Sequence, residues 1–250
     1  MINNDAFLAH QRVLVVTPHA DDETLGCGGT IARIKDLGGE VYCLIGTFGG
    51  IEQYAGPDHS YATPRRAPQM RFVSGSDRLG EFRSVMDILG VDGWDVMYGN
   101  EFHIALDTVP QRDLIARIER SSSVSIDTLA PTMLLMPAAT FNQDHDALFR
   151  ACLAASRPTA SARRNLVPTV LAYDNGTSHW ARPSQGFTAN LYIDVSDYVD
   201  IKLKALNTYV SQGYGRSNGE ELAVLAALRT YGSHVGVDAA EAFQVLRMAV

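Results

Sequence analysis

The chain has 250 residues, of which 46% are hydrophobic and 20% charged, and its formal net charge is −7. This composition is ordinary for a globular protein, and we expect one domain over residues 1–250. An acidic chain repels phosphate backbones, which argues against nucleic acid as a partner. No apolar run approaches the roughly 18 residues of a membrane span, and the first residues lack the pattern of a signal peptide. We therefore expect no transmembrane segment.

The cysteines do not form a recognisable framework. There are three of them, Cys27, Cys43 and Cys152, and no pair has CxxC spacing. An odd number cannot pair completely within one chain, and the spacing does not resemble a Cys-ligated zinc site. We expect buried thiols in a cytoplasmic protein.

Strand and helix patterns alternate along the chain. Short apolar runs predict strands over residues 12–17, 41–47, 95–98, 133–136, 166–173 and 190–195. Apolar residues at helical spacing predict helices over residues 30–37, 78–90, 110–120, 146–156, 197–212 and 219–230. This alternation predicts an α/β fold of three layers with a mostly parallel sheet.

Residues 49–77 are rich in Gly, Pro, Ser and other polar residues, which predicts a long loop beside a functional face. Aromatic and guanidinium groups suit sugar faces and anions, and we expect this loop to shape substrate choice through Tyr54, His59, Tyr61, Arg65 and Arg66. A later strand end offers further pocket candidates, namely Tyr173, Asp174, His179 and Trp180.

The first chemical motif, Pro18-His-Ala-Asp-Asp-Glu23, directly follows the first predicted strand. Ligands of open α/β sheets bind at such strand ends. Crowded carboxylates repel one another, and a divalent cation removes that conflict. His19 and Asp22 can both reach one ion, which leaves Asp21 beside an attacking water as a general base. The alternative is that these acids simply begin a helix.

The glycines that follow, Gly26, Gly28 and Gly29, do not form a dinucleotide site. The spacing is not GxGxxG, and no acid ends the second predicted strand where a ribose would be bound. We expect them to let the loop pass close to the metal and the helix pack on the sheet.

The second motif, Asn142-Gln-Asp-His145, follows the strand at residues 133–136 and precedes a helix. His145 would complete two histidines and one carboxylate, with an open position for water, as in catalytic zinc sites. Asp144 or Asp146 could orient the His145 ring. The same ligands also suit non-haem iron(II), but a neighbouring base at Asp21 favours hydrolysis. A lone histidine at a helix start is the simpler alternative.

The chain resembles the PIG-L/LmbE-like de-N-acetylase family, whose opening motif is closely matched by VVTPHADDETLGCGGT at residues 15–30, with Ala20 in place of the usual proline. Weaker matches cover most of the chain. They are Arg78 and Glu81, His145, the segment at residues 190–205 with its lysine-bearing helix, and Ala240-Glu-Ala-Phe243.

The resemblance implies a Rossmann-like fold and zinc-dependent removal of acetyl from N-acetylglucosamine-containing molecules. It implies His19, Asp22 and His145 as zinc ligands, Asp21 as general base, and Arg78 as a substrate contact at a sugar hydroxyl or phosphate.

One departure concerns the acid of the reaction. The family's second motif usually begins with a histidine, and here that position is Asn142. An asparagine amide can donate a hydrogen bond to an oxyanion but supplies no proton. Either Asp21 serves as both base and acid, or a histidine fills the role. His103 is the first candidate, with His234 and His59 as alternatives.

The predicted function is therefore a zinc-dependent hydrolase that removes an N-acyl group, with acetyl expected, from an amino-sugar conjugate or glycolipid head group. An amidase acting on a thiol conjugate or an antibiotic sugar is a second hypothesis, because only the pocket would differ. A non-catalytic metal- or sugar-binding protein is a third, and its only support is Asn142. The sequence leaves a homo-oligomer open.

Overall fold

A computed structural model describes residues 5–49, 75–158, 166–176, 187–215 and 218–249. Its centre is a seven-stranded sheet in the order β3-β2-β1-β4-β5-β7-β6. The strands are β1 (Arg12–Thr17), β2 (Glu40–Ile45), β3 (Gly93–Val96), β4 (Met133–Pro137), β5 (Thr169–Tyr173), β6 (Leu191–Asp194) and β7 (Ala240–Met248). β7 alone runs opposite to the other six strands, so the mostly parallel α/β prediction is confirmed.

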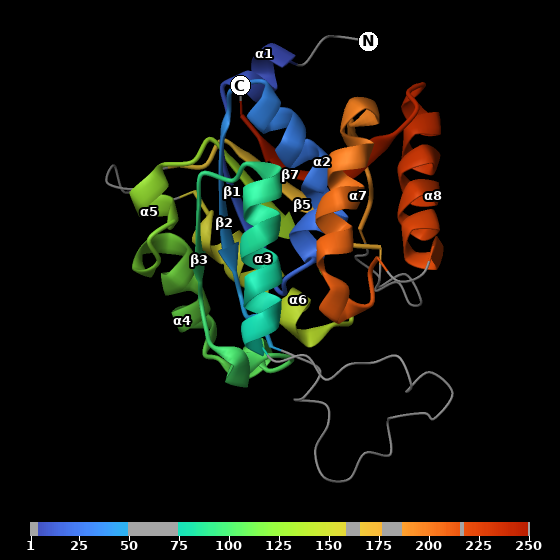
Figure 1. Cartoon of the computed structure of the whole chain (residues 1–250). Helices are drawn as coiled ribbons and strands as arrows, with labels where there is room; N and C mark the ends of the chain where they lie inside the picture. The colour runs from blue at the N-terminus through green and yellow to red at the C-terminus, as the bar shows by residue number, and fades with distance from the viewer. Residues whose placement is uncertain (1–4, 50–74, 159–165, 177–186, 216–217, 250) are drawn as a thin grey trace.

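Helices cover both faces of the sheet and make three layers (Figure 1). One face carries α2 (Asp22–Asp36), α3 (Gly75–Leu89), α7 (Val199–Thr208) and α8 (Asn218–Val235), with the short α1 (Asp5–Ala9) against α2. The other face carries α4 (Gln111–Ala116), α5 (Ile126–Leu129) and α6 (Gln143–Ala155). Across the described ranges, no helix has the length and apolar character needed to cross a membrane.

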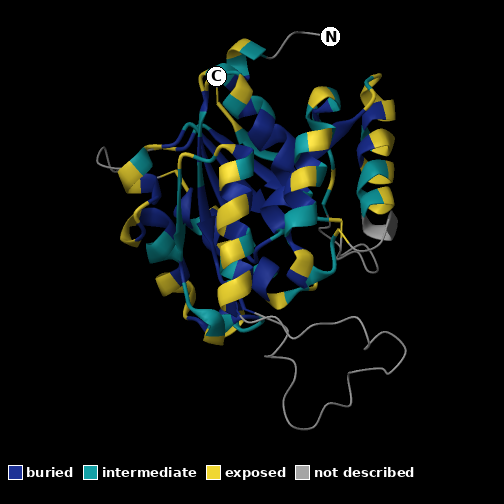
Figure 2. Cartoon of the chain, viewed as in Figure 1, coloured by how far each residue is buried: buried dark blue, intermediate teal, exposed yellow. Residues whose placement is uncertain are grey.

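The central strands are apolar on both faces because both faces are covered. Val13 and Val15 of β1 belong to the core under α2 and α3, whereas Leu14 and Val16 belong to the core under α6. All four side chains are fully buried. Figure 2 shows the same division, with a buried sheet and exposed outer faces on the helices.

The structure differs from the prediction in one additional strand, two additional short helices and the ends of several elements. Strand β7 was not predicted, nor were the short helices α1 and α5. Helix α2 begins at Asp22 rather than at residue 30, and it is kinked at Cys27, whose φ of −146° and ψ of 18° are not helical. Of the predicted loop at 49–77, residues 50–74 lie outside the described part and residues 75–77 begin α3.

The sheet order explains where a site can form. Strand β1 lies between β2 and β4, so the strand order reverses at the β1/β4 boundary. Connections that leave the two strands diverge to opposite faces, and the crevice between them is the usual ligand site of such sheets. Both sequence motifs lie there, since the first follows β1 and the second follows β4.

Candidate metal centre

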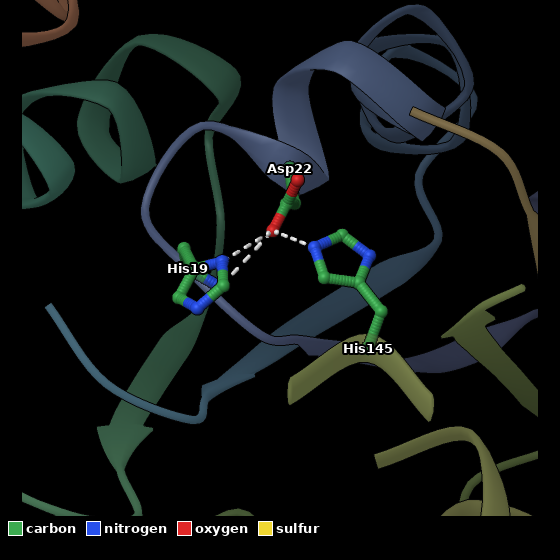
Figure 3. Close-up of side chains that lie close together, drawn as sticks. All are labelled: His19, Asp22 and His145. Atoms are coloured by element: carbon green, nitrogen blue, oxygen red, sulfur yellow. Dashed lines mark hydrogen bonds and ion pairs between the residues drawn. The ribbon is translucent and has the colours of Figure 1, made fainter. Parts of the chain in front are cut away.

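His19, Asp22 and His145 meet at this crevice (Figure 3). One ligand atom from each residue lies within 4.8 Å of the others, and all three residues are buried. Oδ2 of Asp22 lies 3.3 Å from Nδ1 of His19 and 3.2 Å from Nε2 of His145. The structure therefore brings together the three residues predicted as metal ligands, from the loop after β1, the start of α2 and the start of α6.

Asp22 is held firmly in place. Its Oδ2 accepts the backbone N–H of His19 at 3.1 Å, and its Oδ1 accepts a short hydrogen bond from the side chain of Asn175, which follows β5. Burial alone would raise the pKa of Asp22, but the charge and hydrogen bond of His145 and those of His19 lower it well below its usual value. Asp22 is therefore a carboxylate, the form that binds a cation.

Asp144 orients His19, not His145 as predicted. Oδ2 of Asp144 lies 2.8 Å from Nε2 of His19, which leaves Nδ1 toward Asp22. The carboxylate also accepts the backbone N–H groups of Ile104 and Leu106, and it is fully buried. Burial lowers the pKa of His19, but hydrogen bonds to Asp144 and Asp22 outweigh burial and raise it to about 9. The other predicted partner, Asp146, pairs with a surface arginine instead.

Asp21 precedes α2 in a strained backbone conformation. Its φ is 118°, a region that costs a residue with a side chain on the order of 1–3 kcal/mol and often marks functional sites. Buried Glu23 supports this conformation, since its Oε2 accepts the backbone N–H of Asp21 at 3.2 Å. Glu23 is in turn bound by the hydroxyl of Tyr209 at 2.6 Å. No role for Glu23 was predicted from the sequence.

Arg78 of α3 secures the same loop. Its guanidinium donates to the carbonyls of Ala20 and Gly49, each at 2.8 Å, and its Nη2 lies 3.7 Å from Oδ2 of Asp21. Burial raises the pKa of Asp21 to about 8, against the charge of Arg78, which lowers it. Arg78 is 4% exposed, so its observed contacts position the loop, and the predicted substrate contact stays a prediction.

A cavity of about 210 Å³ opens over these groups. Its lining includes the residues predicted as metal ligands, base, acid and substrate contact, namely His19, Asp21, Asp22, Arg78, His103, Asn142 and His145. Tyr173 and Asp174, predicted as further pocket residues, do not line it. Its wall also contains Asn175, Gln212 and Tyr214, which were not predicted at the metal site. The predictions for Tyr54, His59, Tyr61, Arg65, Arg66, His179 and Trp180 fall outside the described residues.

Of the histidines proposed as acids, the structure places His103 in the cavity. Its ring centroid is 4.8 Å from that of His19, in an edge-to-face arrangement. Burial, together with the charges of His19 and Arg78, lowers the pKa of His103 to about 3, against the charge of Asp22, which raises it. His103 is therefore neutral near pH 7. His234 is exposed and packs against Tyr192 and Tyr231, away from this cavity.

Asn142 caps helix α6. Its Oδ1 accepts the backbone N–H groups of Asp144 and His145 at 3.0 and 3.4 Å. Because the oxygen is used in this way, the side-chain NH₂ is the group that can serve a ligand. The cap also fixes the backbone of both neighbouring site residues.

The glycines of α2 allow close packing, as predicted. A Cβ on Gly26 would lie 2.1 Å from Cδ2 of Tyr173, and one on Gly29 would lie 2.9 Å from Cβ of Val195. Beyond the kink, the carboxylate of Glu241 accepts the backbone N–H groups of Gly29 and Thr30. Lys202 of α7 donates to Glu241 and to the carbonyl of Leu25, and both charged side chains are buried. The kinked start of α2 is thus held from β7 and α7.

The residues of the cluster fit a divalent metal ion. Two imidazole nitrogens and one carboxylate oxygen are the ligand types of catalytic zinc, which typically uses three protein ligands and one open position. Asp21, Asp22 and Glu23 also place three acids in the same partly buried segment, and a nearby cation would favour their charged forms. The donor set does not by itself distinguish zinc from iron(II).

Residues 14–156 match the family model of GlcNAc-PI de-N-acetylase, PIG-L. The chain belongs to the PIG-L family. The match runs from within β1 to the end of α6, and so it includes the predicted metal ligands His19, Asp22 and His145 as well as Asp21, Arg78, His103 and Asn142.

Relatives within and around the PIG-L family are consistent with this assignment. The chain is 35% identical over 89 residues to 1D-myo-inositol 2-acetamido-2-deoxy-alpha-D-glucopyranoside deacetylase of Geodermatophilus obscurus, covering 36% of this chain and 29% of that protein. It is 22% identical over 213 residues to diacetylchitobiose deacetylase of Thermococcus kodakarensis, covering 84% and 73%. A solved structure of a conserved protein from Thermus thermophilus superposes with a TM-score of 0.67 at 27% identity, covering 96% of each chain. The chain spans less than a third of the length of the inositol-glycoside deacetylases that it matches.

Proposed function

We propose that this PIG-L family member is a zinc-dependent hydrolase that removes an N-acyl group, with acetyl expected, from an amino-sugar conjugate. The observation that carries the proposal is the buried cluster of His19, Asp22 and His145, with Asp21 in the wall of the same cavity. The relatives named as deacetylases of amino-sugar compounds support the reaction class.

His19, Asp22 and His145 would hold the metal. When bound, zinc polarises an amide carbonyl and lowers the pKa of a water molecule toward neutrality. Asp21 would take the proton of the attacking water as general base. Burial favours the protonated form of Asp21, so a cation held by the cluster would have to act together with Arg78 at 3.7 Å to favour the carboxylate that this step requires.

Donors in the cavity wall would stabilise the developing negative charge. The NH₂ of Asn142 is suited to this, because its oxygen is committed to the cap of α6. His103, neutral near pH 7, can donate a hydrogen bond but carries no surplus proton. We therefore assign the proton delivered to the leaving amine to Asp21, and we assign His103 a hydrogen-bonding role in the site.

The substrate we propose is a small amino-sugar conjugate or a glycolipid head group. The polar wall formed by Arg78, His103, Asn142 and Gln212 suits sugar hydroxyls. We further propose a single domain over residues 1–250, since one sheet includes strands from β1 to β7, and a cytoplasmic location, since all three cysteines are buried free thiols.

Release of acetate from a panel of N-acetylglucosamine conjugates tests the proposal. We expect release that a chelator stops and added zinc restores. If a protein that holds one zinc ion per chain cleaves no conjugate of the panel, the deacetylase assignment is wrong.

A further inference from the structure

A second cavity, of about 410 Å³, lies beside the catalytic cavity. The two cavities share Leu25, Asn175 and Tyr214 as lining residues. Asn175 also donates a hydrogen bond to Asp22, so the shared wall is one side chain away from a proposed metal ligand. The second cavity therefore lies directly next to the place where the reaction would occur.

Helix α8 supplies the long wall of this cavity. Val224, Ala227, Leu228 and Tyr231 lie on one face of the helix and line the cavity, whose lining also includes Leu25 of α2. From Val224 to Tyr231 the helix rises by about 10 Å, so the wall is long enough for an extended chain of several carbon atoms. Figure 1 shows α8 beside α7, and α8 contacts β7 and the edge strand β6.

The two buried charged groups in the wall, Glu241 and Lys202, already have partners. The third charged side chain, Asp174, is partly exposed, and its Oδ1 accepts the backbone N–H of Gly176. Glu241 accepts from Lys202 and from the backbone N–H groups of Gly29 and Thr30. Lys202 also donates to the carbonyl of Leu25 at 2.7 Å. An apolar ligand would therefore leave no buried polar group without its partner, whereas a polar ligand would find these groups engaged.

We propose that this cavity receives the hydrocarbon chain of the substrate's acyl group, so that the protein acts on N-acyl groups longer than acetyl. The inference rests on the proposed N-deacylase function. The sugar side of the amide would face the polar wall of the catalytic cavity at Arg78, His103 and Asn142. The acyl side would pass Leu25 and Tyr214 into the apolar cavity along α8. Lined mainly by apolar side chains and about 410 Å³ in volume, it has the usual character of a small-molecule site.

The test compares amine release from N-acetyl- and N-hexanoyl-glucosamine conjugates that share one aglycone. Each buried methylene contributes about 0.8 kcal/mol, which is about fourfold in kcat/KM. We therefore expect the wild-type protein to favour the hexanoyl amide by about tenfold or more. Ala227→Phe, and separately Val224→Phe, should lower the hexanoyl-to-acetyl ratio of kcat/KM by about tenfold, because the new ring occupies the cavity.

Ala226→Phe is the matched control, because Ala226 is an exposed neighbour on α8 outside the cavity lining. It should leave the ratio unchanged. An octyl glycoside of N-acetylglucosamine forms a further arm, in which the hydrocarbon chain is attached to the sugar instead of the acyl group.

Cleavage of the acetyl amide with no preference for hexanoyl would overturn the acyl-chain assignment and leave the proposed function intact. The assignment would also be overturned if Ala226→Phe and Ala227→Phe changed the hexanoyl-to-acetyl ratio of kcat/KM equally. If Ala227→Phe lowered kcat/KM only for the octyl glycoside, the cavity would hold the aglycone, and the acyl-chain assignment would again be overturned. Cleavage of no amide of either length would contradict the proposed function, and with it this inference.

Discussion

Substitution of Asp144 tests how the site is built, because this one carboxylate both orients a proposed metal ligand and accepts two backbone N–H groups. It orients His19 through Nε2 at 2.8 Å, and it accepts the backbone N–H groups of Ile104 and Leu106 at 2.8 and 2.9 Å. Substitution by asparagine keeps the shape but turns one oxygen into a donor. At least one buried N–H group then faces an NH₂ group and loses its acceptor.

A buried donor without a partner costs about 1–3 kcal/mol, so Asp144→Asn should lower the free energy of unfolding of the metal-free protein by that amount. For a chain of this length, the melting temperature should fall by about 2–4 °C per kcal/mol. Loss of the carboxylate that orients a metal-binding histidine typically weakens metal affinity about 10- to 100-fold. Urea unfolding of the metal-free protein and a zinc titration with a competing chelator measure the two effects separately.

Asp146→Asn is the matched control, since Asp146 pairs with the exposed Arg150 at 2.9 Å on the surface of α6. Such pairs contribute about 0.3–0.5 kcal/mol, and zinc binding should not change. If Asp144→Asn bound zinc as tightly as the wild-type protein, the orienting role of Asp144 would be refuted. Equal effects of the two substitutions would refute it too.

Three further experiments test the packing around the site and in the core. Gly26→Ala should destabilise the protein by about 1–3 kcal/mol in urea unfolding because the new Cβ meets the Tyr173 ring. Gly80→Ala, at an open helical position, is the control and should stabilise the protein by about 0.5–1 kcal/mol, so equal effects of the two changes would contradict the packing at Gly26. Lys202→Met should lower the free energy of unfolding by about 3–5 kcal/mol because Glu241 stays buried without its cation. Combining it with Glu241→Gln should cost less, because the buried charge is removed and only one backbone N–H, of Gly29 or Thr30, loses its acceptor; an equal or larger cost would contradict this. Burial raises the pKa of all three cysteine thiols, Cys27, Cys43 and Cys152. A thiol reagent near pH 8 should therefore label none of them in the native protein and all of them in urea, and labelling of the native protein would contradict their burial.

The parallel core and the meeting of the two motifs could be predicted because the signals are local. Strands β1 and β4 are continuous apolar runs, and the polar residues of a motif follow β1 directly and follow β4 after a short loop. Parallel neighbouring strands bring their carboxyl ends to one edge, so His19 and His145 were expected to meet although they are far apart in the chain.

Strand β7 could not be predicted in the same way. Its sequence, AEAFQVLRM, contains several good helix formers, and it becomes a strand because it pairs with β5 on one side and β6 on the other. The early start of α2 was obscured by its glycines. Those glycines are accommodated by the kink at Cys27 and by the carboxylate of Glu241, which comes from β7.

The partner of Asp144 shows a second limit of sequence reasoning. A carboxylate next to His145 in the chain was expected to orient His145, but residues adjacent in a helix point in different directions. Asp144 points to His19, 125 positions away, and its two backbone partners follow the turn at Asn100–Phe102. Only the folded arrangement of α6 against that segment determines which ring it contacts.

The central claim is that Asp21 moves protons for a metal centre that it does not itself hold. The most direct measurement is turnover and zinc content side by side in wild-type protein and Asp21→Asn. We predict that the variant retains one zinc ion per chain while turnover falls by about 10²–10⁴-fold, the usual contribution of a general base. Full activity in Asp21→Asn, with zinc bound, would contradict the account.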